Sequence, residues 1–272
     1  MPIGSGAQFS GPGDPRTQSL LASRAGINAA IWSNPVYVAS WGDPIRFLGS
    51  GANAVAIHVP DSATPAGPPG GDNALNIVDP THHFVDESWR TSRVFAFNLA
   101  SGFHVRVDLR GDGLTGATAA GMSATGGLIR TWELQSHDIR HALALAVPAS
   151  SMALGPVWPA HSQDTWAPGR YVGALHMGSL VAIPPSVNVA ALGLSAEGLA
   201  IARALQNYGA YVVNTAGQTS LIAEPSAEGI VRAARADMGA IQAQLRVVTN
   251  NGPVSVGGGG APRVGSAPPF SN

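Results

Sequence analysis

The 272-residue chain contains no cysteine and no lysine, so its 15 basic residues are all arginine. The absence of cysteine excludes disulfide bonds, thiolate metal ligands and a cysteine nucleophile. Charged residues make up 11% of the chain and aromatic residues 6%, whereas an average soluble domain is roughly 25% charged. With a net charge of -1 and no basic clusters, the chain lacks the electrostatic signature of a nucleic-acid-binding protein.

Long apolar runs are also missing. The longest, residues 142–152, is interrupted by Pro148 and is too short to span a bilayer. The N-terminus has neither the basic region nor the apolar region of a secretory signal. We therefore expect no membrane insertion and no cleavable signal peptide, and we expect the protein in a virion or outside the cell after release by a route such as lysis.

Glycine and proline, with 34 and 21 residues, divide the first two thirds of the chain into short segments of alternating polarity. Such segments are typical of strands, and they lie at residues 31–40, 44–48, 54–59, 74–78, 93–99, 103–109, 128–134, 139–147, 171–175 and 180–183. Almost no helical pattern separates them, which disfavours a parallel α/β sheet. The pattern predicts an antiparallel β-sandwich or jelly roll, with a barrel as the alternative.

The last third has a different periodicity. Apolar residues at helical spacing predict helices near 195–208 and 226–245. Ser195 is a suitable N-cap for the first of them, and Gly209 a suitable end. The predicted fold class is therefore mainly β, with two or three short helices in the C-terminal third of a single domain spanning residues 18–250.

The two ends differ from this domain in composition. Residues 1–17 are predicted to be an extended N-terminal arm, and residues 251–272 a Gly/Pro-rich C-terminal arm with four consecutive glycines, Gly257 to Gly260. Ordering such a segment costs about 1–2 kcal/mol per residue in backbone entropy. We expect neighbouring molecules to hold the arms, in a homo-oligomer such as a trimer and in contact with other proteins of a particle.

Polar residues concentrate between positions 104 and 141. Glycoside hydrolysis needs two carboxylates, for which Asp108, Asp112 and Glu133 are the candidates. A polysaccharide lyase needs a base and a cation, which His104, His141, Tyr171 and Arg130 offer. The residues predicted to be catalytic, if the protein is an enzyme, are thus Arg130, Glu133, His141 and Asp108. The alternative is structural: His141 shares a face with apolar residues, and Arg130 and Glu133 would form an ion pair.

A second candidate site lies in a Pro-containing loop. Trp158, Trp166 and His161 are predicted to contact a ligand there, because exposed tryptophan stacks on sugar rings, although a tryptophan beside proline is as often a packing residue. Neither His82-His83 with the following acids nor the Asp108–Gly113 loop has the pattern of a metal site. We expect no metal and no cofactor.

Three segments resemble a signature of a poorly characterised group of bacterial and phage-associated β-sandwich proteins. The segments are Gly126–Glu133 (GGLIRTWE), Asp138–Leu143 (DIRHAL) and Ala204–Val213 (ALQNYGAYVV). The resemblance implies a jelly-roll-like domain of the kind met on cell surfaces and in virion fibres or spikes. The resemblance does not assign a catalytic role to any residue of this chain.

Three functions remain open on these observations. The first is a structural or adhesive subunit of an assembled particle, namely a phage virion protein (tail fibre, spike or head decoration) that contacts glycans. The second is a polysaccharide lyase or glycoside hydrolase with a groove near residues 104–141. The third is a carbohydrate-binding module without catalysis, which exposed tryptophan side chains would favour.

Overall fold

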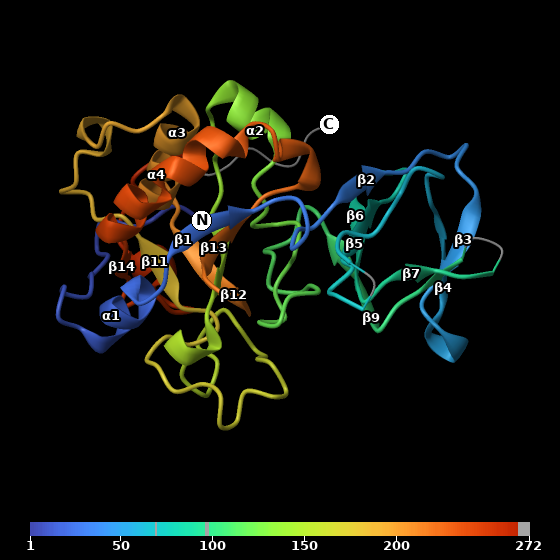
Figure 1. Cartoon of the computed structure of the whole chain (residues 1–272), viewed down its shortest axis with the longest axis horizontal. Coiled ribbons are helices and arrows are strands. Elements are labelled where there is room, and N and C mark those ends of the chain that lie inside the picture. Colours follow the sequence, from blue (N-terminus) through green and yellow to red (C-terminus); the bar gives the residue numbers. More distant parts are fainter. Residues whose placement is uncertain (69, 96–97, 266–272) are drawn as a thin grey trace.

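The computed structural model describes residues 1–68, 70–95 and 98–265. It has two parts, which Figure 1 shows side by side, with the larger on the left. The body comprises residues 1–34 and 110–265. The insert comprises residues 35–109, which leave the body after its first strand and return to it before its second helix.

The body is built on a six-stranded mixed sheet with the order β1-β13-β10-β12-β11-β14. β1 runs parallel to β13 and β10 runs parallel to β12, whereas the other neighbours are antiparallel. β10 is buried along its whole length, as expected for a strand covered on both faces. The strands are β1 (Ala25–Asn28), β10 (Leu143–Val147), β11 (Leu180–Ala182), β12 (Ala210–Thr215), β13 (Thr219–Ile222) and β14 (Arg246–Val247).

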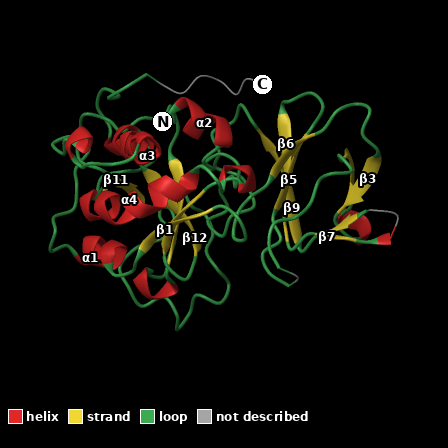
Figure 2. Cartoon of the chain, turned by 45° about the horizontal axis from the view of Figure 1, so that its top comes forward, coloured by secondary structure: helices red, strands yellow, loops and turns green. Residues whose placement is uncertain are grey.

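Helices cover this sheet (Figure 2). They are α1 (Pro15–Leu21), α2 (Thr131–Ser136), α3 (Ala196–Asn207) and α4 (Val231–Gln244), and α3 and α4 lie within the two segments that the sequence marks as helical. Ser195 caps α3, since its Oγ accepts from Gly198 N. The carboxylate of Asp237 on α4 accepts hydrogen bonds from both N and Oγ of Ser195, at 2.9 and 2.6 Å, and so joins the two helices.

The insert consists of two four-stranded mixed sheets, β2-β5-β6-β9 and β4-β3-β8-β7. Leu75 and Ile77 of the first sheet pack against Leu48, Ile57 and Leu99 of the second in one small core. The strands are β2 (Val36–Val38), β3 (Ile45–Leu48), β4 (Val55–His58), β5 (Leu75–Val78), β6 (Phe84–Trp89), β7 (Ser92–Arg93), β8 (Leu99–Ala100) and β9 (Phe103–Asp108).

A buried carboxylate joins the insert to the body. Glu87 of β6 is fully buried and accepts four hydrogen bonds from residues 117–125 of the body. The donors are Ser123 Oγ (2.6 Å) and the backbone N–H groups of Ala117, Ala124 and Thr125 (2.8–2.9 Å). A buried charge requires such compensation, so Glu87 fixes this loop against the insert.

The expectation of a mainly β antiparallel sandwich or jelly roll is wrong. The chain is mixed α/β, with 21% helix and 26% strand in three small mixed sheets. The sequence pattern does not indicate the four parallel strand pairs of the described chain, which are β1 with β13, β10 with β12, β2 with β5 and β3 with β8. Each joins strands far apart in sequence, and short apolar runs carry no information about strand direction.

The strand expected at residues 128–134 is also absent, because this segment enters α2. A capping box starts the helix: Glu133 Oε2 accepts from Arg130 N at 2.9 Å. His137 ends it in the left-handed conformation, with φ of 53°. Local hydrogen bonds at the two ends thus outweigh the apolar pattern of the segment.

The two ends of the chain bind each other. Gly4 N donates to Gly257 O and Gly6 N to Gly259 O, both at 2.9 Å. Gly257 to Gly260 all have positive φ, a conformation that favours glycine. The order of the ends up to residue 265 therefore has a cause within the chain, and the expected oligomer loses its main support and stays a prediction. Residues 266–272 of the expected C-terminal arm lie outside the described residues.

Candidate functional site

Three of the four predicted catalytic residues come together in the body. His141 Nε2 lies 3.0 Å from Glu133 Oε1, and Glu133 caps α2 through Arg130 N. Arg130 pairs with Glu224 and not with Glu133: its Nε donates to Glu224 Oε2 at 2.8 Å. Asp108 is not part of this cluster, because it ends β9 of the insert and accepts from Arg110 N.

This cluster is an ion-pair network around a helix end. Glu133 and Glu224 are buried, and neither lines either of the two cavities described below. His141 Nδ1 lies 2.9 Å from the carbonyl oxygen of Ala142 and Nε2 lies 3.0 Å from Glu133 Oε1, so each ring nitrogen faces an oxygen acceptor, an arrangement that favours the imidazolium form. Burial opposes this charge, but the hydrogen bond and charge of Glu133 raise the pKa of His141.

The predicted aromatic site is a surface loop of the body. Trp166 is exposed, stands edge-on to Tyr171 and has the Arg170 guanidinium over its ring. Tyr171 donates to Asp164 Oδ2 at 2.6 Å. Trp158 is half-buried and His161 is exposed. None of these three predicted residues lines either of the two cavities described below.

The tryptophans have an unusual distribution. All six lie in the described segments, and none is buried. Trp32, Trp41, Trp132 and Trp166 are exposed, although burying such large apolar side chains would stabilise the fold. Trp41 is the most exposed, at 70%, and it borders a cavity.

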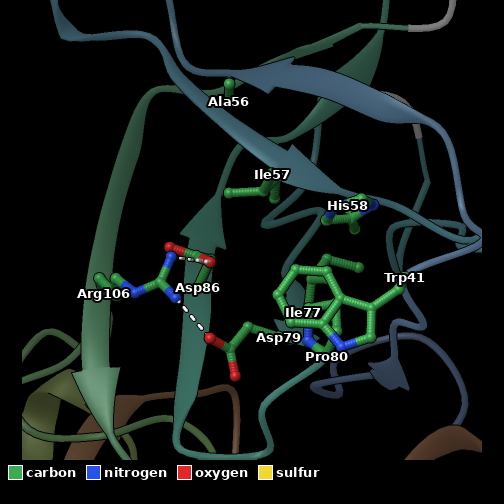
Figure 3. A pocket seen from close by; sticks show the side chains of 9 residues that line it. All are labelled: Trp41, Ala56, Ile57, His58, Ile77, Asp79, Pro80, Asp86 and Arg106. Carbon is green, nitrogen blue, oxygen red and sulfur yellow. Dashed lines mark hydrogen bonds and ion pairs between the residues drawn. The ribbon is translucent and has the colours of Figure 1, made fainter.

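That cavity lies in the insert, between its two sheets, and measures about 150 Å³. Figure 3 shows Trp41 and His58 on one side of it and the charged residues on the other. The lining residues are Trp41, Ala56, Ile57, His58, Ile77, Asp79, Pro80, Asp86 and Arg106. We take this cavity as the candidate functional site.

Strand register produces the charged wall. Ile77 of β5 stands opposite Asp86 of β6, and Asp86 stands opposite Arg106 of β9. Residues directly opposite one another share a face of the sheet, so this row points into the cavity while Glu87, next in sequence, points to the body. Asp79 follows β5 and completes the group from a turn.

One guanidinium bridges the two carboxylates (Figure 3). Arg106 Nη2 lies 2.6 Å from Asp79 Oδ2, and Arg106 Nη1 lies 3.2 Å from Asp86 Oδ2. The side chain of Asp86 is 2% exposed, whereas that of Arg106 is 45% exposed. The site therefore holds a deeply buried carboxylate, that of Asp86, and a guanidinium that reaches solvent, that of Arg106.

The environments separate the pKa values of the two acids. Burial raises the pKa of Asp86 to about 6; Arg106 opposes this shift and the charge of Asp79 adds to it. Burial also opposes ionisation of Asp79, but hydrogen bonds from Thr81, Phe84 and His83, together with the charge of Arg106, lower the pKa of Asp79. At neutral pH the cavity carries two negative charges and one positive charge, a net charge of -1.

The opposite wall is aromatic. The ring centroids of Trp41 and His58 are 5.4 Å apart in an edge-to-face arrangement with an interplanar angle of 82°. His58 Nδ1 lies 2.7 Å from the carbonyl oxygen of Asp43, which can only accept, so Nδ1 carries the proton. This hydrogen bond orients His58, and His58 in turn supports the exposed Trp41.

The sequence gives partial signals for this site. Alternation along 103–109 places Arg106 on a polar face, whereas the strand that carries Asp86 is not among those expected from the sequence. Nothing in the local pattern marks Asp79 or Trp41, because one is a turn residue and the other a loop residue brought in by tertiary structure. If the pairing of residues 84–89 with residues 103–108 had been known, it would have placed Asp86 directly opposite Arg106 and so indicated the site.

Among the described residues, no group of three or more His, Asp or Glu side chains is arranged to hold a metal ion. No helix in the described segments is long and apolar enough to cross a membrane. A scan against protein-family models, a search of curated proteins and a search of solved structures each gave no match for this chain.

Proposed function

We propose that the protein binds glycans through the cavity of the insert, with Trp41 as the stacking surface. The observation that carries this proposal is an exposed tryptophan at the border of a polar cavity that is built by strand register. Sugar rings have apolar faces and hydroxyl edges. An aromatic ring beside fixed carboxylates and a guanidinium complements both features.

Charge selects among sugars. An acidic sugar would bring a third carboxylate towards Asp79 and Asp86, with only Arg106 to compensate, so binding would be opposed. A neutral sugar donates its hydroxyl groups to the carboxylates, and an amino sugar adds a positive charge to a cavity whose net charge is -1. The site therefore favours neutral and amino sugars over uronates.

The test is calorimetric titration with three oligosaccharides: glucosamine, N-acetylglucosamine and galacturonate oligomers. We expect binding of one or both of the first two and none of the third. Trp41→Ala should weaken binding by about tenfold, because aromatic contacts contribute up to about 1.5 kcal/mol. Trp132→Ala is the matched control, since Trp132 is a similarly exposed tryptophan of the body. Absence of binding to all three oligomers, or equal loss in both variants, would contradict the proposal.

We further propose that this binding serves adhesion by an assembled particle, as in a phage fibre or spike. This setting is carried over from the sequence resemblance of Gly126–Glu133, Asp138–Leu143 and Ala204–Val213, although the chain does not have the jelly-roll fold that this resemblance implies. The described parts of the two predicted arms do not support it, because Gly4 and Gly6 bind Gly257 and Gly259 of the same chain. Sedimentation analysis tests it: a trimer or other closed oligomer supports the setting, whereas a monomer at all concentrations contradicts it.

A further inference from the structure

Arg263 differs from the other partly buried arginines. Among the described residues, the guanidinium groups of the other six donate to carboxylates or carbonyl oxygens, and they belong to Arg16, Arg46, Arg93, Arg130, Arg235 and Arg246. The guanidinium of Arg263 has no partner in the described chain, and its Nη1 is shut off from solvent. A donor that is buried without an acceptor is costly, and no described residue supplies an acceptor for Nη1.

The same arginine lines a second cavity, of about 270 Å³. The cavity lies between the N-terminal segment and the C-terminal segment of the body, far in sequence from the insert. Its walls are Ile3, Gly4, Ser5, Ala7, Phe9, Pro185 and Arg263. Arg263 is the one charged residue among them, and Ile3, Ala7, Phe9 and Pro185 provide apolar surface.

We propose that this cavity binds a small carboxylic acid with an apolar body, its carboxylate on Arg263 and its hydrocarbon part against Phe9 and Ile3. A carboxylate matches the guanidinium in both charge and geometry. The apolar walls exclude a fully hydrated anion such as phosphate as the preferred ligand, because they offer it no hydrogen-bond donors besides Ser5 and the backbone.

The position of Arg263 is well defined for this role. Its backbone N donates to Ile3 O at 3.0 Å, and Gly4 bridges to Pro262. Both walls of the cavity are therefore joined by backbone hydrogen bonds next to the arginine. Burial lowers the pKa of Arg263, as expected for a cation that lacks a counter-charge, and a bound carboxylate would remove this effect.

Calorimetric titration of the full chain with octanoate, octanol, acetate and inorganic phosphate tests the proposal. Octanoate should bind at least about tenfold more tightly than each of the other three, since it alone supplies both charge and apolar surface. Arg263→Met should abolish this preference. Arg203→Met, at an exposed arginine of α3, should leave it unchanged.

A second readout separates binding from a purely structural role. Without ligand, Arg263→Met should unfold at the same temperature as the natural chain or at a higher one, because it removes an uncompensated charge. Octanoate should raise the unfolding temperature of the natural chain and not that of Arg263→Met. A lower unfolding temperature of the variant, equal effects of octanoate and octanol, or preferred binding of phosphate would each overturn the proposal. Glycan binding in the insert is unaffected by any of these outcomes.

Discussion

The body and the insert use their apolar residues differently. The body has one large core that includes β10, α3 and α4, and its buried charges form networks at helix and strand ends. The insert has two small cores and exposes large apolar side chains such as Ile45, Phe47 and Trp41. Exposed apolar surface beside a charged cavity costs stability and is typical of a binding region, so the comparison supports the proposal that the insert carries the binding site.

The largest loss of stability is expected from a substitution that breaks the link between the body and the insert. Glu87→Ala leaves four donors of residues 117–125, three of them buried, without an acceptor. We expect a loss of about 3–5 kcal/mol in the free energy of unfolding, measured by urea denaturation. Asp138→Ala, which removes a half-exposed carboxylate paired with Arg140, should cost about 0–1 kcal/mol. Similar losses in the two variants would show that Glu87 does not join the parts.

The next effect is specific to the insert and depends on pH. The pKa of Asp86 is about 6 in the folded protein, above its value of about 3.9 in an unfolded chain. The folded state therefore binds the proton more tightly, and stability is lost as pH rises through this window. Asp86→Asn removes the cost of ionising a buried carboxyl group. The stability of this variant relative to the natural chain should therefore increase by roughly 2 kcal/mol between pH 4 and pH 7.5.

Urea denaturation at the two pH values measures this difference, with hydrogen exchange of β6 amides to locate it in the insert. Asp138→Asn serves as the control, because its carboxylate is exposed. Parallel pH dependence of Asp86→Asn and the natural chain would show that burial of Asp86 has no cost, and would weaken the contrast between the two parts.

The smallest expected effect is a pH-dependent change of stability in the body, from the pairing of His141 with Glu133. The folded-state pKa of His141 is raised, so its pairing with Glu133 stabilises the protein fully below the unfolded value of about 6.5 and is lost as pH rises through the folded value. The natural chain should exceed His141→Gln in stability by about 1 kcal/mol at pH 5.5. The difference should shrink by pH 9. A difference that is constant with pH would mean that His141 is neutral in the fold.

The sequence predicted some elements from local signals. The helical spacing and the Ser195 cap identified α3, and alternation identified most strands of the insert, including the polar face that carries Arg106. The segment at 128–134 was misread, because the capping box of Glu133 and the left-handed His137 depend on single hydrogen bonds that apolar periodicity does not reveal. The pairing of Arg130 with Glu224, 94 residues away, lies beyond any local pattern.

The sequence by itself determined local features. These are the positions of most short apolar segments, the start of α3 at its Ser195 cap, and the tolerance of Gly257 to Gly260 for positive φ, all of which depend on neighbouring residues. Tertiary structure decided the strand directions and the mixed sheets. It also decided that Arg106 bridges Asp79 and Asp86, and that Arg263 has no hydrogen-bond partner for its guanidinium among the described residues. The physical reason is that charge compensation and strand pairing depend on distances in space between segments far apart in the chain.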